Sequence, residues 1–252
     1  MAEDLDFLRK RLCELARRAE GGAYFTFTDF LGLPEQSVLA SVRTGLRGVK
    51  ITTFGGAAGA ERIMARFGNE EDIGYDLPFP IVALRVAPVS QKFAEKLTHR
   101  DFLGSLLALG IERDTLGDIS VIDNVGYVFA KEDIAPFIAE SLFRVRHTEV
   151  VVTKEENPPL ELMYKTEERH IQIASERLDA VLARVLCLSR EDAQRLFPKK
   201  LVYVNGSLCE SLSYTPKEGD KISVRGFGKM IYGGVTGLTR KGRLNVKIQL
   251  SQ

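Results

Sequence analysis

The N-terminal part of the chain begins with apolar residues that recur at three- and four-residue steps. The repeating positions are Leu5, Leu8, Leu12, Leu15, Ala16 and Ala19. Charged residues lie between them and Gly21-Gly22 follow, so the spacing predicts an amphipathic helix that ends at the glycines. A second helix is predicted over residues 33–43, because Pro34 suits a first helical turn. With a β-rich segment at residues 49–54, residues 1–76 are predicted to form a small mixed α/β domain.

Residues 77–156 alternate between short apolar runs and helix-like segments in the order β-α-β-β-α-β. The predicted elements are strands at residues 81–86, 119–122, 127–130 and 149–153 and helices at residues 97–109 and 133–143. Thr98 and Asp101 have the spacing of a capping box, and Asp123-Asn124 has that of a hairpin turn. The order predicts a ferredoxin-like middle domain, a fold that does not by itself identify a function. Its sheet lacks the K/R-G-F/Y signature of RNA-recognition sheets, so we do not expect bases to stack on it.

The segment after the middle domain is predicted to be a connection. Asn157-Pro158-Pro159 interrupts the pattern, and a glutamate-rich stretch follows. Residues 157–174 are therefore interpreted either as a linker or as a connection with a strand near residues 170–173.

Residues 175–252 are predicted to form a third domain, which makes the fold class α+β. The predicted elements are helices at residues 176–186 and 189–197, strands at residues 201–204 and 221–225, and a turn at Asn205-Gly206. Ser175 is expected to cap the first helix, and Ser189 with Asp192 forms a capping box for the second.

The composition is that of an ordinary globular chain, because 44% of the 252 residues are hydrophobic and 27% are charged. The apolar runs are short compared with the roughly 18 residues that cross a bilayer. With no apolar signal core at the N-terminus, we expect a cytoplasmic protein without a membrane span. Cys13, Cys187 and Cys209 and the three histidines are scattered. We therefore expect no disulfide framework, no metal site and no cofactor, and cysteines that are at least half buried.

The nearly neutral total, 35 Lys and Arg against 34 Asp and Glu, hides an asymmetry. Residues 175–252 contain 14 Lys and Arg and 7 Asp and Glu, a net charge of +7, whereas residues 1–174 carry a net charge of −6. A solvated surface usually mixes both signs. The concentration of one sign therefore predicts that a polyanion binds to the last part of the chain.

The two C-terminal helices offer polar side chains for such a ligand. Arg177 and Arg184 are seven residues apart, and Arg190 and Gln194 are four apart, so each pair shares a helix face. If the two helices pack together, Arg177, Arg190 and the helix start at Ser189 meet. Guanidinium groups beside exposed helix amides are suited to phosphate.

The same part of the chain resembles a known RNA-binding module. The matching residues are Arg177-Leu178-Asp179, Ser189-Arg190, Ala193, Val202-Tyr203-Val204-Asn205-Gly206 and Gly219-Asp220-Lys221-Ile222. They are similar to the domain named after small-subunit ribosomal protein four, the alpha-L motif. Further segments resemble one branch of the proteins with this domain, the YlmH-type proteins of bacteria and plastids. These segments are Val224-Arg225-Gly226-Phe227-Gly228-Lys229, His99-Arg100-Asp101-Phe102-Leu103-Gly104, Leu109-Gly110-Ile111 and Gly117-Asp118-Ile119. The resemblance covers most of the chain and is weakest over residues 1–75.

This resemblance implies an RNA-binding protein of the large ribosomal subunit. Its expected partners are structured rRNA and tRNA, and its expected role is the rescue or quality control of stalled translation. The RNA-binding residues that the resemblance and the charge pattern imply are Arg177, Arg184, Ser189, Arg190, Gln194, Lys199, Lys200, Tyr203, Asn205, Arg225 and Lys229. Lys200 stands where the family usually has a glycine, and Pro198 shortens the preceding helix, so the path of the chain there is not predicted.

Two further groups of polar residues are candidates. Arg240, Lys241 and Arg243 lie in the tail, where residues 230–232 and 244–248 are predicted to pair as a hairpin. Its connection, residues 235–242, forms either a flexible basic tip that contacts RNA or a cap that closes the domain. In the middle domain, His99 and Arg100 are either a second RNA contact or solvated residues at a helix start.

Two other classes of function stay open. The same module is attached to pseudouridine synthases and rRNA methyltransferases, and Arg177-Leu178-Asp179 matches the catalytic triplet of the former. The amphipathic helix that follows favours a carboxylate that orients Arg177 instead. Residues 1–174 show no nucleophile beside a base, and residues 55–59 lack the G-x-G-x-x-G spacing, so we expect a turn there and no enzyme. The remaining alternative is a protein-interaction scaffold whose acidic N-terminal two-thirds contacts proteins.

Overall fold

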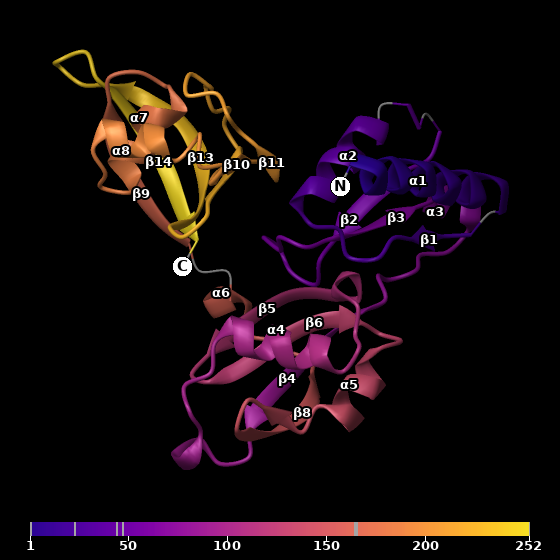
Figure 1. The fold of residues 1–252 in the computed structure, drawn as a ribbon. Helices are drawn as coiled ribbons and strands as arrows, with labels where there is room; N and C mark the ends of the chain where they lie inside the picture. Colours follow the sequence, from indigo (N-terminus) through magenta and orange to yellow (C-terminus); the bar gives the residue numbers. More distant parts are fainter. Residues whose placement is uncertain (1, 23, 44, 47, 164–165, 252) are drawn as a thin grey trace. The chain divides into compact units, whose positions relative to one another are not determined.

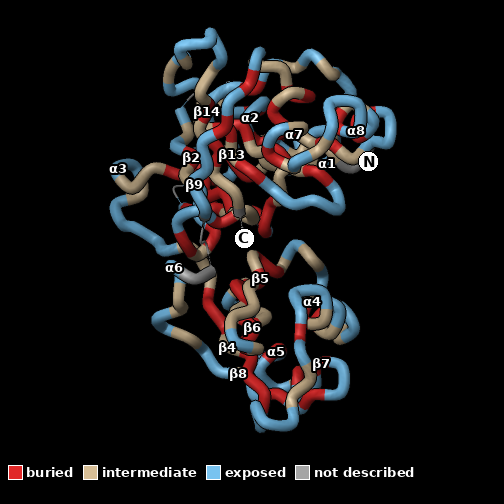
Figure 2. The backbone as a smooth tube through the Cα atoms, turned by 90° about the vertical axis from the view of Figure 1, so that its left-hand side faces the viewer, coloured by how far each residue is buried: buried red, intermediate tan, exposed pale blue. Residues whose placement is uncertain are grey.

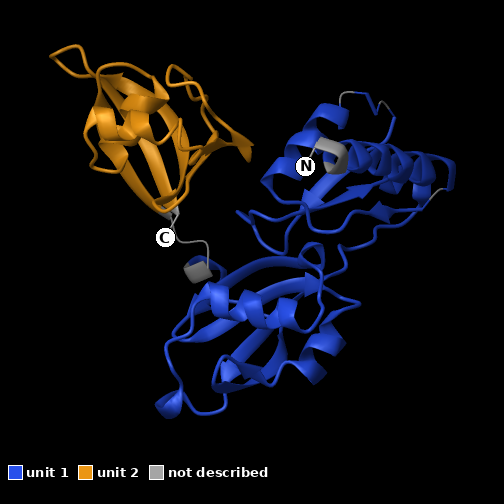
Figure 3. Ribbon diagram, in the orientation of Figure 1, with its two compact units in different colours: residues 1–163 blue, residues 164–252 orange. Residues whose placement is uncertain are grey.

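The structure, a computed structural model, describes residues 2–22, 24–43, 45–46, 48–163 and 166–251. It forms two compact units, Met1–Met163 (unit 1) and Tyr164–Gln252 (unit 2) (Figure 3). Both units mix helices and strands (Figure 1), which confirms the predicted α+β class.

The first part of unit 1 is a three-stranded antiparallel sheet on which two helices pack. Its elements are α1 (Ala2–Gly22), β1 (Thr26–Phe27), α2 (Leu33–Arg43), β2 (Ile51–Phe54), β3 (Met64–Phe67) and α3 (Glu70–Ile73), with the strand order β1-β3-β2. The apolar stripe of α1 supplies Leu12 to a core that contains Phe67. Gly56, in the turn after β2, adopts φ +96°, and a Cβ there would lie 2.3 Å from the Phe129 ring. Any larger residue at this position would clash with Phe129, so close packing explains the glycine.

The second part of unit 1 has the predicted ferredoxin-like order. Its elements are β4 (Ile81–Pro88), η1 (Gln91–Phe93), α4 (His99–Ala108), η2 (Arg113–Thr115), β5 (Leu116–Ile122), β6 (Val125–Lys131), α5 (Ala135–Ser141), β7 (Arg144–Val145), β8 (Thr148–Glu155) and α6 (Leu160–Met163). The antiparallel sheet runs β5-β6-β4-β8-β7, where β7 is a short addition at one edge. Asp101 accepts a hydrogen bond from the Thr98 backbone N–H at 2.8 Å, as the capping box predicts. Asp123 and Asn124 form the predicted hairpin turn with φ values of +49° and +66°.

Partly buried polar contacts join the two parts of unit 1. The carboxylate of Asp118 accepts hydrogen bonds from the backbone N–H groups of Glu61 and Arg62 at 2.7 and 3.0 Å. The Arg62 guanidinium donates to the carbonyls of Leu116 and Phe30 at 2.9 and 2.8 Å. Desolvation lowers the pKa of Arg62 despite the nearby carboxylates. Because these donors and acceptors satisfy one another across the junction, the two parts form one compact unit.

Unit 2 is a six-stranded antiparallel sheet with two helices packed on one face. Its elements are β9 (Thr166–Ile173), α7 (Leu178–Val185), α8 (Arg190–Arg195), β10 (Val202–Val204), β11 (Ser207–Leu208), β12 (Lys221–Val224), β13 (Gly228–Leu238) and β14 (Leu244–Ser251), in the strand order β11-β10-β12-β13-β14-β9. Its core includes Val181 and Leu182 of α7, Ile222 of β12 and Tyr232 of β13. Figure 2 shows the burial of each residue: the buried residues of unit 2 belong mainly to its helices and strands, and residues 240–243 between β13 and β14 are exposed.

Four details of unit 2 bear on the expectations from the sequence. Of the two interpretations of residues 157–174, the strand near residues 170–173 is confirmed, and it is longer than expected, because β9 pairs with β14 over its whole length, for example Ile171 with Val246. Helix α7 is capped at Arg177 rather than Ser175. The hairpin connection is residues 239–243, because residues 235–238 continue β13. Cys187 is exposed, at φ +55° in the reversal after α7, whereas Cys13 is half buried and Cys209 is buried.

Candidate RNA-binding surface

The side chains predicted to meet on α7 and α8 do meet, and a buried carboxylate brings them together. Asp179, in the first turn of α7, is fully buried. It accepts two hydrogen bonds from the Arg177 guanidinium, both at 3.1 Å, and one from the Gln194 amide at 2.8 Å. The Nε atom of Arg190 lies 3.5 Å from the same carboxylate. We call these four residues the Asp179 cluster.

The Asp179 cluster is a network of charged and polar groups in which the carboxylate holds two arginine side chains. Burial acts to raise the pKa of Asp179, but the hydrogen bonds from Gln194 and Arg177 and the two guanidinium charges outweigh it, so the pKa is lowered. The carboxylate is therefore ionised at neutral pH. Arg177 and Arg190 keep 40% and 55% of their side-chain surface exposed. Each guanidinium group therefore faces Asp179 with one edge, and the rest of the group is exposed to solvent.

Ser189 has a structural role at the start of α8. Its Oγ accepts a hydrogen bond from the backbone N–H of Asp192 at 3.1 Å and donates to the Asp192 carboxylate at 2.6 Å. Ser189 is thus the N-cap of α8, and the Asp192 carboxylate binds its hydroxyl group instead of the backbone N–H that a capping box would use. A contact between Ser189 and RNA stays a prediction.

Several other predicted cations of unit 2 are exposed as well. Arg184, Lys199, Lys200, Arg225, Arg240, Lys241 and Arg243 are all exposed, and none of them forms an ion pair with the described residues of unit 2. Their charge is not neutralised within the domain, so they can neutralise phosphates. Arg195, by contrast, pairs with Glu191 at 2.5 Å.

Lys200 explains the departure from the family pattern. Its φ is +56°, in the left-handed region that glycine adopts without strain. The chain therefore follows the path that a glycine there would allow, and Lys200 adds a positive charge at the cost of backbone strain.

Tyr203 and Arg225 form a pair on the uncovered face of the sheet. The guanidinium carbon of Arg225 lies 4.7 Å from the centre of the Tyr203 ring. Tyr203 is paired with Ser223, which is paired with Lys229, so these side chains share one row across three strands. The flanking Val202 and Val224 point into the core.

Asn205 holds the turn after β10 through a second buried carboxylate. Its side-chain amide donates to Asp220 at 2.8 Å and accepts from the Lys221 backbone N–H at 2.9 Å. Asp220 also accepts from the Tyr214 hydroxyl at 2.8 Å. Burial and this bond raise the pKa of Tyr214 to about 12, whereas hydrogen bonds outweigh burial and lower the pKa of Asp220. The sequence indicated a turn at Gly219-Asp220 but not this role of Asp220.

His99 and Arg100 occupy the first turn of α4, and both are exposed. The neighbouring Asp101 carboxylate lies 3.7 Å from Arg146. Because its side chain is exposed, Arg100 is accessible to a ligand. An RNA contact at this position stays a prediction.

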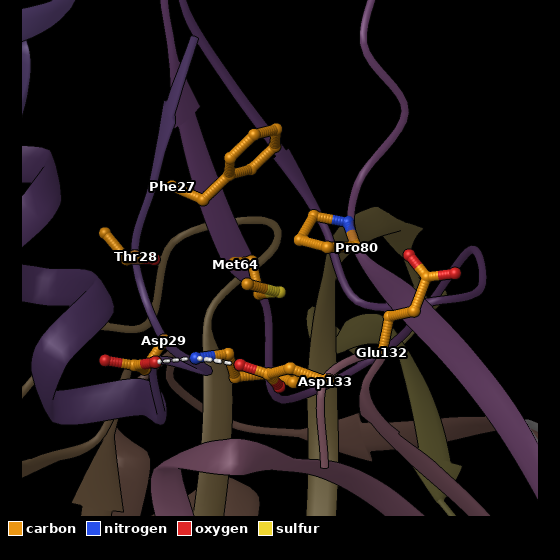
Figure 4. A pocket seen from close by; sticks show the side chains of 8 residues that line it. Phe27, Thr28, Asp29, Met64, Pro80, Glu132 and Asp133 are labelled. Atoms are coloured by element: carbon orange, nitrogen blue, oxygen red, sulfur yellow. Dashed lines mark hydrogen bonds and ion pairs between the residues drawn. The ribbon is translucent and has the colours of Figure 1, made fainter. Parts of the chain in front are cut away.

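Unit 1 contains a cavity of about 430 Å³ between its two parts (Figure 4). The lining residues are Phe27, Thr28, Asp29, Met64, Pro80, Lys131, Glu132 and Asp133. The Lys131 ammonium lies 2.9 Å from Asp29 and 3.5 Å from Asp133 (Figure 4). Because two carboxylates neutralise this lysine, the cavity is poorly suited to a phosphate-bearing cofactor.

The described residues contain neither a cluster suited to a metal ion nor a helix suited to a membrane. No group of three or more His, Cys, Asp or Glu side chains there could hold a metal ion. No helix in these ranges is long and apolar enough to cross a membrane.

Comparison with known proteins places these features in a family. The model of the putative RNA-binding domain in YlmH matches residues 79–158, and that of the S4 domain matches residues 176–222. A protein of Bacillus subtilis (strain 168) named ribosome-associated protein quality control protein P2 is 32% identical over 226 residues, which cover 88% of this chain and 86% of that protein. The chain belongs to the YlmH family.

A solved YlmH structure gives a partial match. Cell division protein YlmH from Streptococcus pneumoniae is 20% identical, with a TM-score of 0.47, and the match covers 59% of this chain and 88% of that chain. Within the YlmH chain described here, the Asp179 cluster lies inside the S4 match. The β13–β14 hairpin and the turn before it lie beyond that match.

Proposed function

We propose that this YlmH-family protein associates with the large ribosomal subunit, where it binds structured rRNA and tRNA in the rescue or quality control of stalled translation. Unit 2 provides the main RNA contact, and the protein acts in the cytoplasm without catalysing a reaction. The observation that carries this proposal is the net charge of +7 in residues 175–252, which include the two exposed guanidinium groups that contact Asp179. The name of the Bacillus subtilis relative supports the connection to the ribosome.

The geometry of Asp179 argues against the pseudouridine synthase alternative. A catalytic aspartate must reach the atom on which it acts. Asp179 is fully buried and already accepts hydrogen bonds from Arg177 and Gln194. These bonds fit an aspartate that orients Arg177 rather than one that attacks a nucleotide.

The proposal is tested by binding to purified large ribosomal subunits over a series of salt concentrations. We expect the logarithm of the affinity to fall by about 0.7 to 0.9 per phosphate contact for each tenfold rise in salt. Arg184→Ala with Lys199→Ala should weaken binding and reduce this slope, since both side chains are exposed.

The matched control removes two exposed cations from α1, Arg9→Ala with Lys10→Ala. It lowers the net charge of the protein equally but leaves unit 2 intact. Equal loss of binding in the two double variants would show that unit 2 does not provide the main contact.

A further inference from the structure

Phe227 is an aromatic side chain that the fold leaves in contact with solvent. It lies in the turn between β12 and β13, where its backbone N–H donates to the Val224 carbonyl at 3.0 Å. The residue is 49% exposed. Gly226 and Gly228 on either side adopt φ +85° and +120°, which are backbone conformations that glycine adopts readily. The two glycines thus make a tight reversal with Phe227 at its apex.

The side chains around this turn are cationic or aromatic. Arg225 precedes the turn and lies over the Tyr203 ring, and Lys229 follows it in the same row of the sheet as Tyr203. From Lys221 to the end, the chain contains seven Lys and Arg and no Asp or Glu. An anionic ligand that approaches Phe227 therefore meets no acidic residue of this segment.

This combination fits a nucleotide better than an apolar protein surface. An apolar partner that covered Phe227 would also remove water from Arg225 without compensating its charge. A nucleotide carries a flat base and a phosphate a short distance apart, so it can satisfy the ring and the cations together. Stacking of unpaired bases on aromatic side chains is a general mode of RNA recognition.

We propose that Phe227 stacks on an unpaired base of the bound RNA, while Arg225 and Lys229 contact the adjacent phosphates. The inference rests on the proposed RNA-binding function and adds a requirement to it. The RNA must offer an unpaired nucleotide at this turn, because a base inside a duplex does not expose its face.

The test measures binding of the full-length protein to a short oligoadenylate and to a fully paired RNA duplex with the same number of phosphates. Phe227→Ala should weaken oligoadenylate binding roughly 5- to 150-fold, the range for loss of one stacked base. The salt dependence should not change, since the phosphate contacts remain. Duplex binding and the thermal midpoint should stay as in the wild type.

Two other variants separate stacking from other contacts. Phe227→Leu keeps apolar surface but has no ring, so it should bind oligoadenylate as weakly as Phe227→Ala does. Phe93→Ala is the matched control, because Phe93 is 82% exposed and lies beside Lys92 but belongs to unit 1. It should bind both RNAs as the wild type does.

Fluorescence provides a direct readout, because the chain contains no tryptophan. Phe227→Trp should keep the affinity, and oligoadenylate should quench its emission more strongly than the duplex does. If the wild type binds oligoadenylate and Phe227→Ala binds it equally well, stacking is refuted and RNA binding stands. If the wild type binds neither RNA nor the large subunit, the proposed function fails together with this inference.

Discussion

Replacing Asp179 with asparagine tests the idea that one buried carboxylate organises the RNA-binding surface. The substitution keeps the shape of the side chain but removes its charge. It also replaces one acceptor oxygen by an NH₂ group, which cannot accept the hydrogen bond from Arg177 or Gln194. We expect Asp179→Asn to fold, to be less stable, and to hold the two arginines less firmly.

The magnitude follows from the partners that the carboxylate loses. Asp179 accepts three hydrogen bonds at 2.8 to 3.1 Å, two of them from a guanidinium. Removing one partner of a fully buried ion pair costs about 3–5 kcal/mol. Here Arg177 and Arg190 are partly exposed and can be rehydrated. We therefore expect a loss of about 2–3 kcal/mol in the free energy of unfolding, nearer the value for hydrogen bonds to charged groups.

The dependence on pH provides the sharper test. The pKa of Asp179 is lowered in the folded protein, so the stabilisation from its ionised form is fully present above the unfolded pKa of about 3.9. It is lost as the pH falls through the lower, folded pKa. The stability difference between the wild type and Asp179→Asn should therefore be constant near neutral pH and shrink below about pH 4.

The assay is urea unfolding at several pH values, combined with hydrogen exchange of the α7 and α8 amides to assign the loss to unit 2. Glu191→Gln is the control, because Glu191 and its partner Arg195 are both exposed. Such a surface pair contributes about 0–1 kcal/mol. If Asp179→Asn is as stable as the control at neutral pH, or if its deficit persists unchanged in acid, the assigned role of the carboxylate is wrong.

Three further predictions concern backbone strain, the Asp220 network and the hairpin tip. Lys200→Gly should be more stable than Lys200→Ala by about 1 kcal/mol in urea unfolding, because only glycine adopts the left-handed backbone conformation without strain. Both variants lose the same charge, so equal stabilities would contradict the strain at Lys200. Asn205→Ala should lower the free energy of unfolding by about 1–3 kcal/mol, since it leaves Asp220 with one donor fewer; calorimetry that finds no change would contradict this. Arg240→Ala with Lys241→Ala should weaken association with large subunits while the thermal midpoint barely moves, because exposed charges contribute little to folding; sedimentation identical to that of the wild type would argue for a hairpin that only closes the domain.

Local signals in the sequence predicted those parts of the fold that local contacts determine. The capping box at Thr98, the N-cap at Ser189 and the turn at Asn205-Gly206 depend on residues a few positions apart, and the structure contains all three. The order of the middle domain could be predicted for the same reason, since its helices and strands have clear periods.

Contacts between distant residues account for most of the differences. Helix α7 begins after Arg177 because the Leu178 N–H donates to the Tyr214 carbonyl at 2.8 Å, a bond that no local pattern reveals. Among residues 167–173 of strand β9, only Ile171 and Ile173 are buried, so the apolar pattern of the strand is short. Its pairing depends on β14, near the other end of the chain.

The candidate site shows the same division. The sequence pattern predicted that Arg177 and Arg190 meet, and the ion pairs with Asp179 confirm it. The bond from Gln194 to Asp179 joins residues 15 positions apart on two helices, so it could be seen only in three dimensions. The Arg225 contact with Tyr203 was hidden for the same reason.

Cryo-electron microscopy of the full-length protein on purified large ribosomal subunits tests the central claim most directly. Our account predicts that residues 166–251 lie against RNA. Arg184, Lys199 and Arg240 should face phosphates, and Arg177 and Arg190 should bridge from Asp179 to the RNA backbone. A map in which this unit faces solvent, or contacts only ribosomal proteins while unit 1 covers the RNA, would contradict the account.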